Sequence, residues 1–194
     1  MKTKIYHRHS IRLTGYDYTQ NGCYFLTICT RNRECLFGEI QNAMMFLSDI
    51  GMKVNECWLD IPNHFPQIVL HEYVIMPNHL HGIIEINNTN TIESNIGVIV
   101  GANNHSPLRS PQPQTTPSLL QFRPNGTSRT VGSVVRGFKI GVTKQVGFSP
   151  WQRNYYEHII RNGESYNIIV QYMAQNPMKW EEDCFYYESQ KAAI

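Results

Sequence analysis

The stretch that most restricts the possible folds is residues 67–86, QIVLHEYVIMPNHLHGIIEI. It contains two runs rich in β-branched, aromatic and other large apolar side chains, separated by Pro77 and Asn78. Such runs predict strands, and this Pro-Asn step is typical of a turn. The stretch therefore predicts two strands joined by a tight turn.

The second of these strands opens with His79, Leu80 and His81. Side chains alternate faces along a strand, so the two histidines point the same way, with Cα atoms roughly 6–7 Å apart. Two imidazoles at that separation can converge on one divalent ion, while Leu80 packs on the other face. As ligands they are expected to lie outside the hydrophobic core. The alternative is a pair of surface histidines, and the motif alone leaves both interpretations open.

Length and composition indicate a globular protein. The chain has 194 residues, of which 41% are hydrophobic and 16% charged, enough for one domain with a sizeable core. A net charge of +2 neither requires nor excludes a nucleic-acid partner. The five cysteines form no Cys-x-x-Cys pair and we see no secretory signal, which favours reduced thiols and a cytoplasmic location. No apolar run approaches about 20 residues, so we expect no membrane partner.

The other periodic segments predict further strands and helices. Strands are predicted over segments of high β-propensity: residues 23–30, residues 36–46 with a break near Gly38, and residues 153–161. Helices are predicted where apolar residues recur at helical spacing: from Ser48 or Asp49 to Pro62, over residues 131–142, and over residues 164–175. This order of elements predicts an α+β fold, a mainly antiparallel sheet with helices packed on it.

Residues 88–130 differ in composition from the rest of the chain. Apart from the short apolar piece 96–100, they are rich in Pro, Ser, Asn, Gln and Thr. Such a segment cannot bury enough apolar surface to offset the cost of ordering it. We therefore predict a single domain over residues 1–194 with a polar, largely disordered insertion loop at about 88–130.

Basic side chains near the ends of predicted elements are candidates for contacts with nucleic-acid phosphates. Residues 1–14 include Arg12 and form either a solvated terminus or an arm lying on phosphates. The remaining candidates follow the first strand, lie on the polar side of the 131–142 helix, or begin the last strand: Arg31, Arg33, Arg136, Lys139 and Arg153.

The last predicted helix carries Tyr172, with Asn176 four residues later. This spacing places the two side chains on one helix face. One interpretation is a core tyrosine and an ordinary helix end before Pro177. The other requires the helix to lie across the histidine strand. Tyr172 is then a nucleophile beside a metal, and Asn176, or with weaker support Gln175, is a third ligand through oxygen.

Five segments carry a pattern that spans nearly the whole chain outside residues 87–130. They are residues 10–18 (SIRLTGYDY), 24–30 (YFLTICT), 73–82 (YVIMPNHLHG), 151–161 (WQRNYYEHIIR) and 172–177 (YMAQNP). The PNHLHG and WQR segments are specific in combination. With them, the chain resembles the REP-associated tyrosine transposases, a branch of the single-tyrosine HUH transposases of bacterial insertion sequences.

The resemblance implies a ferredoxin- or RRM-like α+β fold and an enzyme that nicks and transfers single-stranded or hairpin DNA. In such proteins the His-hydrophobe-His pair binds Mg²⁺ or Mn²⁺. The tyrosine of the last helix attacks the DNA to give a 5′-phosphotyrosine, and the polar residue four positions later completes the metal site. These roles carry over to His79, His81, Tyr172 and Asn176. The DNA sequence recognised, and the choice between monomer and homodimer, stay open.

Other classes of protein share parts of this pattern. A DNA- or RNA-hairpin binding protein that has lost catalysis has the same fold, although the four intact site residues argue against it. A nucleotide hydrolase of the histidine-triad kind also carries His-hydrophobe-His, but needs a third histidine where this chain has Ile83. A structural zinc site at the pair has weak support, because no cysteine lies near it in the sequence.

Overall fold

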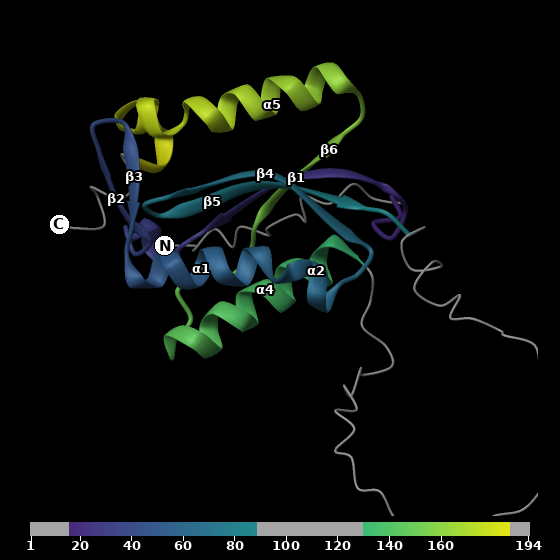
Figure 1. The fold of residues 1–194 in the computed structure, drawn as a ribbon, viewed down its shortest axis with the longest axis horizontal. Coiled ribbons are helices and arrows are strands. Elements are labelled where there is room, and N and C mark those ends of the chain that lie inside the picture. Colours follow the sequence, from purple (N-terminus) through teal and green to yellow (C-terminus); the bar gives the residue numbers. More distant parts are fainter. Residues whose placement is uncertain (1–15, 89–129, 187–194) are drawn as a thin grey trace, which may run out of the picture.

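The computed structural model describes residues 16–88 and 130–186, which form a sheet with helices on both faces (Figure 1). Within these residues the main sheet has four antiparallel strands in the order β4-β5-β1-β6. The strands are β1 (Gly22–Cys29), β4 (Ile68–Met76), β5 (His79–Ile86) and β6 (Tyr156–Ile160). The predicted α+β fold with an antiparallel sheet is confirmed.

The hairpin predicted from residues 67–86 is confirmed as β4 and β5. Its register runs from Ile68 opposite Ile86 to Met76 opposite His79, so the strands turn at the two residues between them. β5 also pairs with β1 on its other side and is therefore a central strand.

One face of the sheet is covered by α1 (Asp49–Leu59), α2 (Ile61–His64) and α4 (Val131–Val146) (Figure 1). Leu80 and Ile84 of β5 point to this face and are fully buried in the main core cluster, together with Trp58 of α1 and Phe138 of α4. Leu80 thus packs on the face opposite the histidines, as the alternation of the strand requires.

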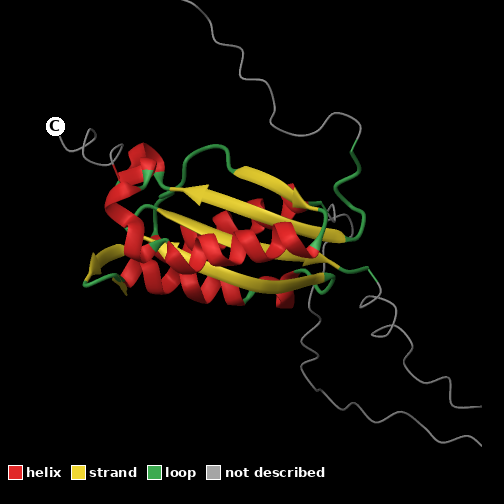
Figure 2. Ribbon diagram, turned by 90° about the horizontal axis from the view of Figure 1, so that it is seen from above, coloured by secondary structure: helices red, strands yellow, loops and turns green. Residues whose placement is uncertain are grey.

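The other face is covered by α5 (Gly163–Gln175), which the 3₁₀ helix η2 (Pro177–Glu182) follows. Figure 2 views the molecule from this side, with α5 lying across the strands. A smaller cluster of buried side chains joins α5 to the sheet: Phe25, Ile83, Ile160 and Met173. The last helix therefore lies on the same side of β5 as the histidines.

Residues 36–46 differ from their prediction. They form two short strands, β2 (Gly38–Gln41) and β3 (Met44–Leu47), which pair with each other as a hairpin separate from the main sheet. Asn42 and Ala43 between them have positive φ angles of 51° and 60°, as a tight hairpin turn requires. An Asn-Ala pair is not a typical turn signal, which is why the reversal was missed.

Smaller differences concern the ends of elements. Pro62 does not end the first helix but lies in the first turn of α2, where a proline removes no intrahelical hydrogen bond. The strand predicted over residues 153–161 is shorter than predicted, because only Tyr156–Ile160 (β6) pair with β1. Arg12 and residues 89–129 of the predicted insertion lie outside the described residues. Among the described helices, none has the length and apolar character needed to cross a bilayer.

Gly82 of β5 packs directly against Trp58 of α1. A Cβ atom at this position overlaps the indole ring of Trp58. That ring is 1% exposed and is flanked by Tyr73 and Phe138, with centroids 6.0 and 5.4 Å away, so it has little room to move. We expect Gly82→Ala to lower the free energy of unfolding by about 1–3 kcal/mol, measured by chemical denaturation. Gly163→Ala is the control, since a Cβ there meets nothing within 4 Å; equal stability of the two variants would contradict the packing argument.

Candidate active site

His79 and His81 point from β5 toward α5, and their imidazoles converge. Their Nε2 atoms are 3.0 Å apart, and the ring centroids are 4.5 Å apart. The two side chains are 0% and 2% exposed, so they are not surface histidines. The expectation that they lie outside the core is wrong, because neighbouring elements bury them completely.

The outer nitrogen of each imidazole is held by a polar side chain. His79 Nδ1 donates to Asn78 Oδ1 at 2.8 Å, since an amide oxygen can only accept. The Asn78 amide is itself fixed, because its Nδ2 donates to the backbone oxygens of Arg33 at 3.1 Å and Phe185 at 2.9 Å. His81 Nδ1 lies 2.8 Å from Thr27 Oγ1 on β1. These contacts orient both rings and leave the lone pair of His79 Nε2 directed at its partner.

Burial keeps both imidazoles neutral. It lowers the pKa of His81 to about 3 and holds the pKa of His79 well below its usual value. Repulsion from a proton on His81, and from the charge of Arg33, would act on His79 in the same direction. Because the Thr27 hydroxyl can donate or accept, His81 can carry its proton on either nitrogen. With the proton on Nδ1, both Nε2 lone pairs face the same point.

Tyr172 of α5 reaches the histidine pair. Its hydroxyl lies 3.3 Å from His81 Nε2, and its ring packs edge-on against His81 with centroids 5.3 Å apart. The side chain is 46% exposed, so one side of the phenol is open to solvent. Burial of the other side raises the pKa of Tyr172, and the nearby amide of Asn176 opposes that rise.

Asn176 follows α5 as its C-cap, one turn beyond Tyr172, and is 3% exposed. Its Nδ2 is buried and makes no hydrogen bond of normal geometry with the described residues, although the amide approaches the Tyr172 hydroxyl. Gln175 is exposed, and its Oε1 accepts from Lys179 at 3.0 Å instead. The structure therefore brings Asn176, and not Gln175, into the site.

These residues fit a bound divalent ion. Two neutral imidazoles converge, and the Asn176 side chain, whose Nδ2 lacks a hydrogen-bond partner among the described residues, can present its amide oxygen by rotating about its last bond. Such a donor set adds no charge to a divalent ion, so its positive charge remains for a substrate.

Aromatic side chains from the C-terminal part cover the histidines. Phe185 lies 4.6 Å from the His79 ring and Trp180 of η2 lies 6.1 Å from it, measured between centroids. The guanidinium of Arg33 lies over the Phe185 ring, 4.2 Å from its centroid. With this cover in place, the His79 side chain has no contact with solvent.

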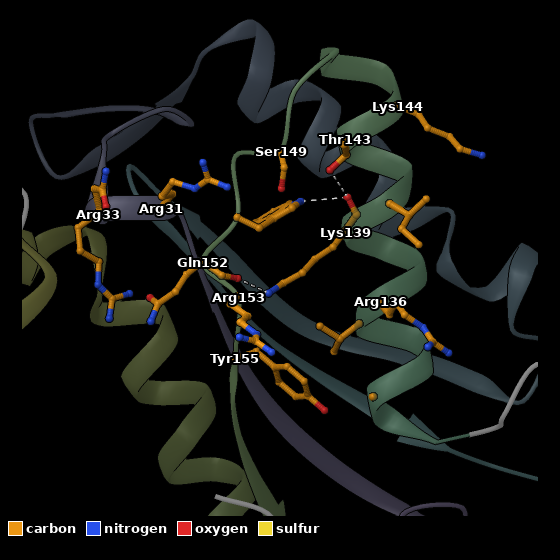
Figure 3. A pocket seen from close by; sticks show the side chains of 15 residues that line it. Arg31, Arg33, Arg136, Lys139, Thr143, Lys144, Ser149, Gln152, Arg153 and Tyr155 are labelled. Carbon is orange, nitrogen blue, oxygen red and sulfur yellow. Dashed lines mark hydrogen bonds between the residues drawn. The ribbon is translucent and has the colours of Figure 1, made fainter. Parts of the chain in front are cut away.

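A second feature of the molecule is a basic cavity of about 1160 Å³ between α4, the segment 149–155 and the 3₁₀ turn Arg31–Arg33 (Figure 3). Five residues predicted as phosphate contacts line it: Arg31, Arg33, Arg136, Lys139 and Arg153. Since β1 ends at Cys29 opposite His79, the cavity lies at the same end of the sheet as the histidines.

The basic side chains in this cavity are not equivalent. Lys139 Nζ donates to the backbone oxygens of Gln152 at 2.8 Å and Asn154 at 3.1 Å. It thereby holds the segment 149–155 in place across the cavity from α4 (Figure 3). Burial lowers the pKa of Lys139 to about 8. Arg136 on α4 and Arg153 on the segment 149–155 are both exposed. Lys139 is therefore mainly a support, whereas the two arginines are available to a ligand.

Comparison with known proteins identifies relatives of the chain. An uncharacterized protein of Haemophilus influenzae is 48% identical over 189 residues, which cover 95% of this chain and 96% of the relative. The chain belongs to the family of this Haemophilus influenzae protein. No family model matches the sequence.

The fold of this family is also found among solved structures. A REP-associated tyrosine transposase bound to a REP hairpin matches with a TM-score of 0.54, over 88% of this chain and 74% of that chain. The sequence identity is 19%, so the match establishes the shared fold.

In this family member, sequence reasoning missed the residues that hold and cover the histidines. Asn78 directly precedes His79, and that adjacency was an available signal. Thr27 is 54 residues from His81, and Phe185 is 107 residues from Asn78. No local sequence pattern connects the members of either pair.

Proposed function

We propose that the protein is a metal-dependent single-stranded DNA endonuclease and strand transferase of the single-tyrosine HUH transposase kind, acting at hairpin-bearing DNA. The observation that carries this proposal is the position of the Tyr172 hydroxyl, 3.3 Å from His81 Nε2. A nucleophile beside converging metal-binding nitrogens is the arrangement that attack on a phosphodiester needs.

The reaction balances without a nucleotide cofactor. Tyr172 Oη forms a bond to phosphorus while the bond to the 3′ oxygen breaks, giving a 5′-phosphotyrosine and a 3′-OH. The tyrosine loses a proton and the 3′ oxygen gains one. Because the phosphotyrosine keeps the energy of the phosphodiester, attack by another 3′-OH joins strands. A bound Mg²⁺ or Mn²⁺ supplies polarisation of the scissile phosphate.

The residues around the nucleophile have separate tasks. Asn78 and Thr27 orient the imidazoles through Nδ1. Burial raises the pKa of Tyr172, so the hydroxyl is protonated near neutral pH and loses its proton during attack. The amide of Asn176 favours the phenolate that develops.

The basic cavity is the proposed path of the DNA backbone toward this site. Its exposed cations suit phosphates, and Tyr155 on its wall offers a ring on which a base can stack. The hairpin in the structure of the REP-associated tyrosine transposase supports the choice of hairpin DNA as substrate.

Binding of single-stranded DNA is expected to weaken steeply with salt. Replacing both Arg136 and Arg153 by glutamine should reduce the slope of log K against log salt concentration by roughly 1.4, about 0.7 for each phosphate that is no longer neutralised. Fluorescence anisotropy at several salt concentrations measures this slope. Lys53→Gln, an exposed change on α1 outside the cavity, is the control. An unchanged slope in the double variant would place the DNA elsewhere.

The experiment that tests the function is incubation with single-stranded hairpin DNA from the flanks of the gene, with Mg²⁺ or Mn²⁺. A covalent protein–DNA adduct on a denaturing gel is the expected result, and the matching duplex should react poorly. Binding without an adduct would instead support a hairpin-binding protein without catalysis. The histidine-triad alternative gains nothing from the structure, since Ile83 is fully buried in the cluster beneath α5.

A further inference from the structure

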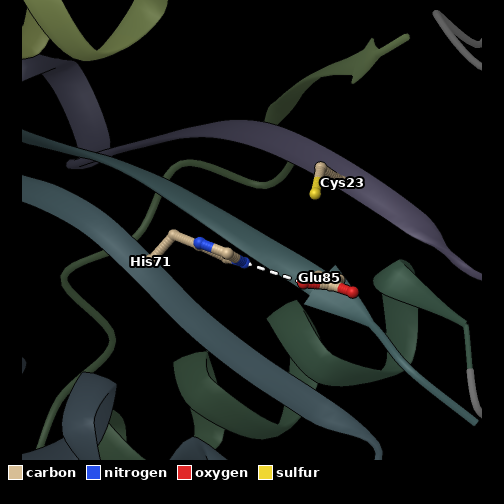
Figure 4. Close-up of side chains that lie close together, drawn as sticks. All are labelled: Cys23, His71 and Glu85. Carbon is tan, nitrogen blue, oxygen red and sulfur yellow. Dashed lines mark hydrogen bonds and ion pairs between the residues drawn. The ribbon is translucent and has the colours of Figure 1, made fainter. Parts of the chain in front are cut away.

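A second group of metal-binding side chains lies on the α5 face of the sheet, away from the histidine pair. It consists of Cys23 on β1, His71 on β4 and Glu85 on β5, which come from three neighbouring strands (Figure 4). One ligand atom from each lies within 4.8 Å of the others. Glu85 is four residues beyond His81 on β5, a separation of roughly 13 Å along the strand.

The backbone brings these three side chains together in two ways. Cys23 is directly opposite Glu85 in the β1–β5 register, which places the two side chains on the same face. On β4, the register shifts between Leu70 and Tyr73, so the strand contains a bulge there. Leu70 and Tyr73 both pack against the main core, although they are three positions apart and would lie on opposite faces of a regular strand. The extra residue accounts for this and leaves His71 directed toward Glu85.

A chain of hydrogen bonds fixes the His71 ring. The Tyr166 hydroxyl of α5 donates to Glu72 Oε2, because an ionised carboxylate can only accept. Its single proton is then used, so the same oxygen accepts from His71 Nδ1 at 3.1 Å. His71 Nε2 faces Glu85 Oε2 at 3.0 Å. A carboxylate, a hydroxyl and an imidazole in series are the outer contacts that typically orient a metal-binding histidine.

The contact between His71 Nε2 and Glu85 Oε2 is stable only if a positive charge lies at it. With Nδ1 carrying a proton, His71 Nε2 and the Glu85 carboxylate repel each other unless a second proton or a cation lies between them. A second proton on His71 makes the two residues an ion pair. Such a pair does not involve the Cys23 thiol, whereas a metal ion can bind all three side chains. Burial and the charge of Glu85 raise the pKa of Cys23, so the thiol keeps its proton unless a cation replaces it.

We propose that Cys23, His71 and Glu85 form a zinc site. Sulfur, imidazole nitrogen and carboxylate oxygen are the three ligand types that Zn²⁺ takes in proteins, and a water completes the tetrahedron. Tetrahedral Zn²⁺ at its usual bond lengths places neighbouring ligand atoms roughly 3.3–3.8 Å apart. His71 Nε2 and Glu85 Oε2, 3.0 Å apart, need to separate by a few tenths of an ångström. Cys23 Sγ, within 4.8 Å of both ligand atoms, needs to approach by at most about 1 Å, within reach of side-chain rotation.

Such a site joins three strands and, through Tyr166, the first turns of α5. The ion bridges β4, β5 and β1, and the His71–Tyr166–Glu72 hydrogen bonds connect that bridge to the helix that carries Tyr172. Zinc binding therefore stabilises the α5 face of the sheet. The proposal does not depend on the DNA chemistry, because its test uses the metal alone.

Cobalt(II) is the probe for this site, since a Co²⁺–thiolate bond gives a near-ultraviolet charge-transfer band. The full chain, freed of metal and reduced, should develop that band at one equivalent of Co²⁺ and lose it when Zn²⁺ is added. Cys23→Ser should abolish the band, whereas Cys35→Ser, at an exposed cysteine outside the cluster, should keep it. A wild-type chain without the band, or a Cys23→Ser variant that retains it, would overturn the proposal.

Two further variants show whether Co²⁺ binds at this zinc site, and not at the histidine pair, and whether the outer hydrogen bonds support that binding. Tyr166→Phe removes only the outer hydrogen bonds and should weaken Co²⁺ binding about ten- to a hundredfold. His81→Ala should leave the thiolate band unchanged, because that ring belongs to the other site. Should Cys23→Ser fail to fold, Glu85→Gln decides the question: unchanged Co²⁺ affinity in that variant contradicts the site, and a loss of tenfold or more supports it.

Discussion

Replacing Tyr172 by phenylalanine is expected to reduce the covalent protein–DNA adduct below detection. The change removes the hydroxyl that lies 3.3 Å from His81 Nε2 and keeps the ring that packs against His81 and Phe25. Because the side chain is half exposed, the free energy of unfolding should change by less than about 1 kcal/mol. DNA binding should survive, since the exposed arginines lie in the basic cavity. A denaturing gel measures the adduct, and anisotropy measures binding.

The matched controls are Tyr155→Phe and Tyr156→Phe. The Tyr155 hydroxyl donates to Glu157 at 2.9 Å on the wall of the basic cavity, and Tyr156 is exposed on the edge strand β6. Because one hydroxyl is held by a carboxylate and the other side chain faces solvent, both variants should form the adduct. An adduct that persists in Tyr172→Phe would show that the nucleophile lies elsewhere.

Removal of the metal site should have an equally large effect. We expect His79→Ala, or excess chelator with the unmodified chain, to abolish cleavage and tight binding of Mn²⁺. The variant should also lose about 1–3 kcal/mol of stability, because the substitution leaves Asn78 Oδ1 buried without its donor. Calorimetric titration with Mn²⁺ and chemical denaturation separate the two effects.

His158→Ala is the control for this change. His158 is an exposed histidine on β6, opposite Phe25 in the register, and should affect neither metal binding nor cleavage. Cleavage that continues in His79→Ala, or in excess chelator, would refute a metal-dependent reaction at this pair.

The sequence was most informative where a short period decides which way side chains point. Alternation along a strand placed His79 and His81 on one face of that strand. Helical spacing placed Tyr172 and Asn176 on one face of the last helix. These relations depend on backbone geometry within a few residues, so they hold wherever the strand and the helix form. The same reasoning failed at residues 36–46, where the turn at Asn42 and Ala43 carries no typical turn signal.

The sequence also identified the basic residues singly, without showing that they share a cavity. Arg31, Arg136 and Arg153 lie on three segments that are distant along the chain, and the packing of α4 beside the segment 149–155 brings them together. Lys139 shows the limit of interpreting charge alone, because its ammonium group is used to hold the backbone of that segment.

Contacts between side chains that are far apart in the sequence were decided by the tertiary structure alone. The burial of His79 under Phe185, the choice of Asn176 over Gln175, and the meeting of Cys23, His71 and Glu85 all depend on strand register, on the β4 bulge and on helix docking. By itself the sequence determined which residues share a face of an element. Which faces meet is set by packing across the whole core, and no local period in the sequence encodes it.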